Sequence, residues 1–243
     1  MSEETGKLFI VSTPIGNLED ITIRALKTLR AADLIAAEDT RRTRILLSRY
    51  RITKPLTSLN SHNEHYKGGR LIEKILSGVD IAIVSDAGTP GISDPATSVI
   101  SSAVKRGIKV VPVPGATAAV TALSLSGLPT DRFFFEGFLP RKKGKREKRF
   151  KEWEACDKTV IFYESPYRII ATLSEMVRFL GNRDVVVARE LTKLYEEIIR
   201  GPLDEVIKRL GQKKVRGEFT VVVGKKMEPD TVESGPDGEV FEV

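Results

Sequence analysis

Short apolar runs alternate with helix-patterned segments throughout the first half of this 243-residue chain. Between two of these runs, apolar residues recur three apart at Ile23, Leu26 and Leu29, which is the spacing of one helix face. Strands that alternate with helices predict a parallel sheet with crossover connections, so we expect an α/β fold. The strands are expected at residues 8–13, 33–38, 80–85 and 109–113, and the helices at 21–32, 40–50, 64–77, 94–105 and 116–126.

The second half has a different pattern, because several of its apolar runs lie close together in hairpin-like pairs. The change begins at residues 128–130, so we expect one α/β domain at 7–128 and a second at 129–226. Hairpin pairs make neighbouring strands antiparallel, so the second sheet is expected to be mixed. The acidic segment 227–243 is expected to be a disordered tail. Strands are expected at 133–138, 159–163, 184–189, 196–200 and 218–223, and helices at 166–180 and 203–210.

The composition predicts a cytoplasmic protein without a membrane segment. Hydrophobic residues make up 41% of the chain, enough for a sizeable core, but no apolar run approaches the roughly 18 residues of a membrane helix. The acidic start at Ser2, Glu3 and Glu4 is unlike a signal peptide. A single cysteine excludes disulfides within the chain, and His62 and His65 are more simply explained as surface residues than as metal ligands. No metal is therefore predicted.

The charge is positive and unevenly distributed. The net charge is +6, yet residues 227–243 contain six acids and no lysine or arginine. Without that segment the chain has 39 basic and 27 acidic residues, a net charge of +12. A basic body of this kind indicates a polyanionic partner.

The segment SDAGTPGISDP, residues 85–95, is the clearest indication of a ligand site. Ligands of open parallel sheets bind beyond the carboxyl ends of the strands, and glycines there let a ligand approach the backbone. We expect the amides of Ala87 and Gly88 to donate to a carboxylate or a ribose, and Asp86 to accept from an ammonium or a hydroxyl group. The absence of a Walker lysine and of G-x-G-x-x-G argues against triphosphates and dinucleotides.

Three other turns follow predicted strands. The turns 12–18 (STPIGNL) and 113–118 (VPGATA) contain glycine and proline beyond what a simple connection requires, although each could be an ordinary strand-to-helix turn. The segment 38–44 (EDTRRTR) opens a helix with acids, which the helix dipole explains. The dipole does not explain the arginines that follow, so we expect these to bind a partner such as phosphate. They are Arg41, Arg42 and Arg44.

These four turns, with FEGFLP, FYESPYR and ARELTKLYEE further along, resemble one family from residue 7 to about 225. It is the ribosomal small-subunit RNA 2′-O-methyltransferase I family, within the tetrapyrrole (corrin and porphyrin) methylase superfamily. SDAGTPGISDP is its most specific motif. The family usually has glycine after that motif, where this chain has Ala96. We expect little consequence, because residue 96 should lie inside the helix that Asp94 caps.

The resemblance implies two α/β domains with the cofactor S-adenosylmethionine in the cleft between them, and a homodimer. It implies methylation of a ribose 2′-oxygen at a decoding-region cytidine of 16S ribosomal RNA in the small subunit, with S-adenosylhomocysteine as the other product. The loop TPIGN replaces the glycine-rich first loop of the corrin methylases, which favours RNA over a tetrapyrrole. By position, the cofactor residues are expected to be Pro14, Ser85, Asp86, Ala87, Gly88, Ile92, Ala116 and Thr117 from the first domain, and Tyr163 and Leu191 from the second.

A ribose hydroxyl is a poor nucleophile, so a base or a positive field at the oxygen would help the reaction. Glu164 and Arg168 are the first candidates, because they follow a strand of the second domain and are expected to face the cleft. On this hypothesis, Glu164→Ala keeps cofactor affinity and loses turnover. For every candidate, a structural ion pair or a helix cap is the alternative. The other candidates are Asp39, Glu190 and Glu38 as bases, and Arg41, Arg189 and Lys193 as electrostatic partners.

The segment 141–151 has eight basic residues in eleven and is expected to contact the RNA backbone, although an exposed loop is the ordinary alternative. Two competing functions remain open: a methylase of a tetrapyrrole or another small molecule, and an RNA-binding module with a vestigial pocket. The basic segment argues against the first, and the intact glycine turn argues against the second. The residues expected to contact RNA here are Arg141, Lys142, Lys143, Lys145 and Arg146.

Overall fold

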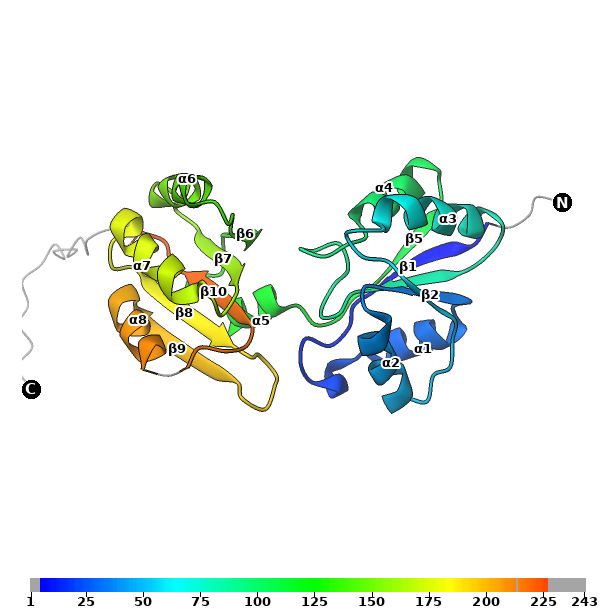
Figure 1. Cartoon of the computed structure of the whole chain (residues 1–243), viewed down its shortest axis with the longest axis horizontal. Helices are drawn as coiled ribbons and strands as arrows, with labels where there is room; N and C mark the ends of the chain where they lie inside the picture. The colour runs from blue at the N-terminus through cyan, green and yellow to red at the C-terminus, as the bar shows by residue number, and fades with distance from the viewer. Residues whose placement is uncertain (1–4, 213, 227–243) are drawn as a thin grey trace, which may run out of the picture.

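The computed structural model describes residues 5–212 and 214–226, and within them two five-stranded sheets follow one another along the chain (Figure 1). The strands of the first sheet are β1 (Lys7–Val11), β2 (Leu34–Ala37), β3 (Leu56–Ser58), β4 (Ile81–Val84) and β5 (Lys109–Val113). Those of the second are β6 (Phe133–Phe138), β7 (Thr159–Glu164), β8 (Asp184–Arg189), β9 (Glu197–Pro202) and β10 (Phe219–Val223). The helices are α1 (Ile23–Ala31), α2 (Thr40–Arg49), α3 (Glu64–Leu76), α4 (Thr97–Lys105), α5 (Ala118–Ser124), α6 (Lys143–Glu154), α7 (Ile169–Leu180) and α8 (Leu203–Gly211), with a short 3-10 helix η1 at Leu18–Asp20.

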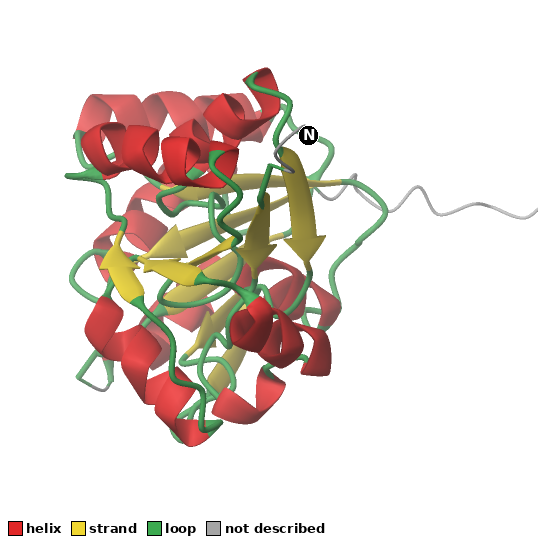
Figure 2. Ribbon diagram, turned by 90° about the vertical axis from the view of Figure 1, so that its right-hand side faces the viewer, coloured by secondary structure: helices red, strands yellow, loops and turns green. Residues whose placement is uncertain are grey.

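The first sheet is parallel throughout, in the order β3-β2-β4-β1-β5, as predicted. Its inner strands β2 and β4 are buried on both faces, which explains their continuous apolar runs. In β4, Ile81 and Ile83 pack with α3 and α4, whereas Ala82 and Val84 pack with α1 and α2. The two helix pairs cover opposite faces of the sheet (Figures 1 and 2). The carboxyl ends of its strands therefore lie together at one edge, where the four unusual turns begin.

The second sheet is mixed, in the order β6-β7-β10-β8-β9, as predicted. Only the β6–β7 pair is parallel within the described residues; the other neighbours are antiparallel. Val185 and Val187 of β8 belong to the core under α6, α7 and α8, whereas Val186 and Ala188 face the opposite side. That opposite side is covered by α5.

Helix α5 packs on the second sheet, although it precedes the expected domain boundary at residue 128. Ala122 and Leu123 share a buried cluster with Ile161 of β7 and Val222 of β10. Ile15, from the turn after β1, is buried in the same cluster. The chain therefore passes from one sheet to the other between β5 and α5, and the turn after β1 helps to join the two domains.

The start of α4 differs from the prediction. The helix begins at Thr97, and Ala96 is its N-cap residue, with φ of 117° and no side-chain hydrogen bond to the helix. The expectations that Asp94 caps this helix and that Ala96 lies inside it are both wrong. A residue with a Cβ is strained at such a φ, so a glycine would fit this position with less strain.

Three elements, α6, β3 and η1, were not predicted, and α7, like α4, begins later than expected. The basic segment forms α6, whose Phe150 and Trp153 pack into the core of the second domain. Strand β3 is too short to stand out in the sequence, and α7 begins at Ile169 instead of residue 166. Of the helices in the described parts of the chain, none combines the length and the apolar character that a membrane crossing requires. The expected acidic tail at 227–243 lies outside the described residues.

Candidate active site

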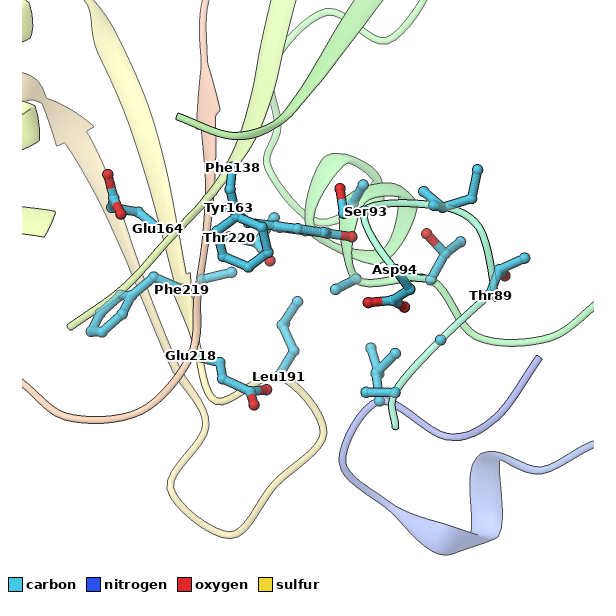
Figure 3. A pocket seen from close by; sticks show the side chains of 18 of the residues that line it. Thr89, Ser93, Asp94, Phe138, Tyr163, Glu164, Leu191, Glu218, Phe219 and Thr220 are labelled. Atoms are coloured by element: carbon cyan, nitrogen blue, oxygen red, sulfur yellow. The ribbon is translucent and has the colours of Figure 1, made fainter. Parts of the chain in front are cut away.

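A cavity of 740 Å³ lies between the two domains, beside the carboxyl ends of the first sheet (Figure 3). Pro14 and Ser85 instead line an adjoining cavity of 200 Å³, which shares Asp86 and Ala87 with the larger one. Ala116 lines neither cavity, but its carbonyl oxygen lies 3.7 Å from where a Cβ on Gly88 would stand. The predicted cofactor residues that line the larger cavity are Asp86, Ala87, Gly88, Ile92, Thr117, Tyr163 and Leu191.

Two backbone hydrogen bonds join the glycine turn to the turn after β1. The Thr13 amide donates to the Gly88 carbonyl at 2.8 Å, and the Gly88 amide donates to the Thr13 carbonyl at 3.1 Å. Gly88 has φ of 85°, a conformation that favours glycine. Its amide is thus occupied within the protein, and the expectation that it serves a ligand is wrong. The turn is instead held as a rigid wall of the cavity.

Asp86 connects the end of β4 to the end of β2. Its Oδ1 accepts from the Asp39 amide at 2.9 Å, and its own amide donates to Oε2 of Glu38 at 3.2 Å. Arg42 Nη1 lies 3.5 Å from its Oδ2. Burial raises the pKa of the Glu38 carboxyl, although the hydrogen bond from the Asp86 amide opposes this. These contacts gather Glu38, Asp86 and Arg42 on one wall of the cavity.

Asp94 is the acid that the sequence interpretation missed as a site residue. Its carboxyl projects into the cavity instead of capping α4 (Figure 3). Burial raises its pKa to about 7, helped by the negative charges of Glu38 and Asp86 and opposed by a hydrogen bond from Ser85. The carboxyl is therefore close to half-ionised at neutral pH. The position of Asp94 in the glycine turn indicated a site residue. Because proline is common at the first position of a helix, Asp94 before Pro95 was more simply interpreted as a helix cap.

Glu164 and Arg168 form an ion pair inside the second domain. Arg168 Nη2 lies 2.6 Å from Glu164 Oε1, which also accepts from the Ser165 amide at 2.7 Å. Glu164 Oε2 accepts from the Thr172 hydroxyl at 2.9 Å, and the side chain of Glu164 is fully buried. Glu164 borders the cavity, but its carboxylate points away from it (Figure 3). This geometry favours the structural alternative over a catalytic role.

The other catalytic candidates are also engaged in local contacts. Asp39 caps α2 by accepting from the Arg41 amide at 2.8 Å, and hydrogen bonds from the Arg41 side chain hold the pKa of its carboxyl well below the usual range. Burial alone would raise the pKa of Glu190, but hydrogen bonds from the Glu218 amide and Lys193 lower it. Arg189 pairs with Glu197 and also donates to a backbone carbonyl. Neither Asp39 nor Glu190 lines the larger cavity.

The basic residues expected to bind RNA fall into two groups. Arg146 is buried, because Glu175 accepts from it at 2.7 and 2.8 Å and two backbone carbonyls accept from its Nη1. It braces α6 against α7, so the expectation that it contacts RNA does not fit its position. Arg42 lines both cavities. The remaining basic residues are exposed: Arg41, Arg44, Arg141, Lys142, Lys143 and Lys145.

Aromatic side chains of β6 form another wall of the cavity. Phe135 and Phe138 contact the Tyr163 ring edge-on, with centroids 5.0 and 5.5 Å apart. Phe133 and Phe138 line the cavity yet remain about half exposed. The sequence predicts this strand and contains part of it in the motif FEGFLP, but its aromatic residues were not predicted to be site residues. An exposed aromatic edge beside a cavity is a surface on which a planar group can stack.

Comparison with known proteins matches these features to one family. Residues 7–207 match the family model of Tetrapyrrole (Corrin/Porphyrin) Methylases. Relatives named Ribosomal RNA small subunit methyltransferase I are 51% identical in Halalkalibacterium halodurans, over 95% of this chain and 81% of that protein, and 49% identical in Thermotoga maritima, over 91% and 99%. The chain belongs to the ribosomal RNA small subunit methyltransferase I family, within the tetrapyrrole methylases.

Solved structures of tetrapyrrole methylases and of diphthine synthase share the fold of this methyltransferase family member. Diphthine synthase superposes with a TM-score of 0.71 at 17% identity, covering 91% of this chain and 90% of that one. Uroporphyrin-III C-methyltransferase of Thermus thermophilus, solved with S-adenosyl homocysteine, superposes with a TM-score of 0.62 at 18% identity, covering 90% and 97%. These likenesses confirm the predicted two-domain fold. Among the described residues of this family member, no group of three or more histidine, cysteine or acidic side chains is arranged to hold a metal.

Proposed function

We propose that this methyltransferase transfers a methyl group from S-adenosylmethionine to the 2′-oxygen of a ribose in 16S ribosomal RNA of the small subunit. The target is a cytidine of the decoding region. The observation that carries the proposal is the 740 Å³ cavity, which the glycine turn of the first domain and the aromatic strand of the second line together. Relatives that share about half of its residues are named for this class of substrate.

The cavity suits S-adenosylmethionine in size, lining and charge. Its volume of 740 Å³ is within the range of roughly 300–1,000 Å³ that small-molecule sites occupy. Ile15, Ile92 and Leu191 offer apolar contacts for the adenine ring. The carboxyl of Asp86 on the cavity wall would offer negative charge to the cationic cofactor. The solved neighbour that contains S-adenosyl homocysteine supports the same choice.

The aromatic wall of the cavity, formed by β6, suits an RNA strand. RNA-binding proteins commonly stack unpaired bases on aromatic side chains, and Phe133 and Phe138 present such rings beside the cavity. Exposed lysines at the start of α6 follow this strand closely in the chain and would contact the phosphates. Arg42 lies on the opposite wall, in α2. We infer that the target nucleotide enters between these two basic regions.

The protein's part in the reaction is to align two ligands and to exclude water. The cofactor supplies an electrophilic methyl group on a sulfonium. The glycine turn and the second-domain strands would hold the cofactor and the ribose, and alignment of the two can supply much of the rate. Residues of both domains line the cavity and would exclude water from bound ligands, which strengthens electrostatic interactions inside.

A methyl-transfer assay tests the proposal. The purified protein is incubated with labelled S-adenosylmethionine and one acceptor: assembled small subunits, free 16S ribosomal RNA or a tetrapyrrole. Labelled nucleosides are then identified after digestion of the RNA. Label in a 2′-O-methylcytidine of the subunit or of its RNA is the expected result. Label in the tetrapyrrole alone would support the competing small-molecule function. Cofactor binding by calorimetry without any transfer would support the binding-module alternative.

The RNA surface has a separate test in the salt dependence of binding. Replacing Lys142, Lys143 and Lys145 together by alanine should weaken RNA binding and reduce the slope of log K against log salt by about 2, at roughly 0.7 for each lost contact with a single strand. The matched control replaces Lys74, Lys105 and Lys109, which are near the amino-terminal edge of the first sheet, and should leave the slope unchanged. Equal slopes for both triple variants would remove α6 from the RNA surface.

We also expect the protein to act as a homodimer, as the family resemblance implies. Sedimentation equilibrium at micromolar concentration measures this directly. A molar mass near twice that of the 26.9 kDa chain supports the dimer, and the mass of a single chain contradicts it.

A further inference from the structure

The carboxyl of Asp94 stands apart from the other acids at the cavity. It projects inward from the loop between β4 and α4 and faces Tyr163 of β7 across the cavity (Figure 3). Glu164 forms an ion pair with Arg168, and Asp86 accepts from the Asp39 amide and lies against Arg42. Glu38 accepts from the Asp86 amide, and Glu218 pairs with Lys193. The Ser85 hydroxyl, which also donates to the Gly88 carbonyl, lies beside Asp94, and within the described residues no lysine, arginine or histidine forms an ion pair with Asp94.

The backbone of this loop is arranged so that Asp94 is free of α4. Ser93 and Ala96 have φ of 63° and 117°, both in the region that side chains with a Cβ rarely adopt. Glu64 of α3 takes over the helix start, because its Oε1 accepts from the amides of Ala96 and Ser98 at 3.1 and 2.9 Å. A strained backbone that turns a side chain away from a helix cap and into a cavity indicates a functional demand on that side chain.

The charges around Asp94 make it a stronger base than an ordinary aspartate. Glu38 from the end of β2 and Asp86 from the end of β4 repel its ionised form, and the Tyr163 hydroxyl faces it from β7. Arg42 of α2 also lines the cavity, and it lies against Asp86. Burial is the main cause that raises the pKa of Asp94 to about 7, and the charges of Glu38 and Asp86 add to it, which brings the pKa near the value at which a general base works best at neutral pH.

We propose that Asp94 accepts the proton of the ribose hydroxyl to which the methyl group is transferred, an inference that rests on the function proposed above. The oxygen–carbon bond forms as the carbon–sulfur bond breaks, and the electron pair of the broken bond stays on the sulfur. The hydroxyl proton passes to a carboxylate oxygen of Asp94. Solvent then takes it up when the product leaves, which restores the carboxylate.

Single-turnover methyl transfer to small-subunit RNA tests this role with Asp94→Asn, which keeps the shape of the side chain and removes its basicity. General bases commonly contribute 10²–10⁴-fold, so we expect the rate to fall by at least about 10²-fold. The wild-type rate should rise with pH and level off at or below about pH 7, because the cationic cofactor favours the ionised carboxylate. The variant should lose this dependence. Asp94→Glu, which restores a carboxyl, should recover part of the rate.

Cofactor binding supplies a readout that does not depend on turnover. Calorimetry in buffers of different ionisation enthalpy counts the protons released when S-adenosylmethionine binds at pH 7. The wild type should release a fraction of a proton, because a bound cation lowers the pKa of a carboxyl that faces it. Asp94→Asn should release less and should bind with a Kd within about threefold of the wild type. Binding also shows that the variant is folded.

Three outcomes would overturn the inference. A wild-type rate for Asp94→Asn on an RNA that the wild type methylates removes Asp94 alone and leaves the proposed function intact. A Kd weakened more than tenfold with a normal rate at saturating cofactor makes Asp94 a cofactor-binding residue instead. If the wild type methylates neither subunits nor free RNA, the proposed function and this inference fall together. The matched control, Asp157→Asn, alters an exposed acid that pairs with Arg132 and lines neither cavity, and should change neither rate nor affinity.

Discussion

Two turns at the edge of the same cavity each carry a carboxyl, and their surroundings are opposite. The turn after β7 is preceded directly by Glu164, the last residue of that strand, whose oxygens accept from Arg168, the Ser165 amide and the Thr172 hydroxyl. The turn after β4 holds Asp94, which has the Ser85 hydroxyl and two repelling acids beside it. Both residues border the cavity. Only Asp94 keeps a carboxylate available to a ligand.

The difference shows that a nearby residue of opposite charge in the sequence can make a structural acid resemble a catalytic one. An acid four residues before an arginine resembles a catalytic pair, and it is equally the pattern of a structural ion pair. Arg168, the Ser165 amide and the Thr172 hydroxyl occupy both carboxylate oxygens of Glu164, so neither oxygen is free to meet a ligand. The acid without a cation retains basicity, because burial and like charges disfavour its ionised form.

The largest expected effect that tests this comparison is a loss of stability in Glu164→Ala. The substitution leaves Arg168 and the buried Thr172 hydroxyl without their partner, and breaking a buried pair costs roughly 3–5 kcal/mol. Because the Arg168 side chain is 26% exposed and water can solvate it, we expect the lower end, about 3 kcal/mol. Denaturant unfolding measures the free energy of unfolding directly.

Glu205→Ala is the matched control for that experiment. Glu205 pairs with Arg209 at 3.7 Å on the exposed face of α8, and such surface pairs contribute about 0.2–1 kcal/mol. The two glutamates should therefore differ by about 2 kcal/mol or more in their effect on unfolding. A Glu164→Ala protein with wild-type stability and no turnover would instead restore Glu164 as a catalytic candidate.

The fold was largely predictable because its strands are short runs of β-branched and apolar residues between clear helices. The parallel first sheet and the mixed second sheet both followed from that spacing. Helix α6 was missed because its buried face consists mainly of Phe150, Trp153 and the aliphatic part of Arg146, among many lysines. Helix α5 was placed with the first domain because its position on the second sheet depends on packing, which the order of elements does not reveal.

The sequence predicted which turns form the site, but not which hydrogen bonds they make or which side chains face the cavity. The sequence identifies the turn that carries Asp86 and Gly88, which follows a predicted strand, and the strand end at Tyr163, and both match family motifs. It does not reveal that the Gly88 amide is occupied by Thr13, because that hydrogen bond joins two distant turns. Nor does it reveal that Asp94 faces the cavity, which depends on a left-handed backbone at Ala96.

A second prediction concerns the pH dependence of stability at Asp94. Its folded pKa of about 7 is above the ordinary aspartate value of 3.8, so the folded state binds the proton more tightly than the unfolded state. The stabilisation is fully present below pH 3.8 and is lost as pH rises through 7. Asp94→Asn stays neutral, so its midpoint of thermal unfolding should exceed that of the wild type by more at pH 8 than at pH 5.

We expect this effect to be smaller than that of Glu164→Ala, because the Asp94 carboxyl is only partly buried and solvent screens its charge. Thermal unfolding of both proteins from pH 5 to pH 8 measures it. The Asp157→Asn variant, which alters an exposed carboxyl, provides the reference. A constant difference across that range would show that Asp94 ionises normally, and the contrast between the two turns would then disappear.

The smallest expected effect is a gain in stability from Ala96→Gly. Glycine adopts φ of 117° without the strain that a Cβ imposes there, which is of order 1–3 kcal/mol. Two effects oppose this gain. The substitution removes a fully buried methyl group, which costs about 0.8 kcal/mol, and glycine has greater freedom in the unfolded chain, which costs about 0.5–1 kcal/mol. The net gain should be about 1 kcal/mol or less.

Ala103→Gly, at an equally buried position inside α4, lacks the strain and should instead lose about 1–2 kcal/mol. Denaturant unfolding measures the change in the free energy of unfolding for each substitution. A gain for Ala96→Gly and a loss for Ala103→Gly would locate the strain at Ala96, the residue that turns Asp94 away from the helix. Equal losses would show that the loop holds Asp94 in the cavity without strain.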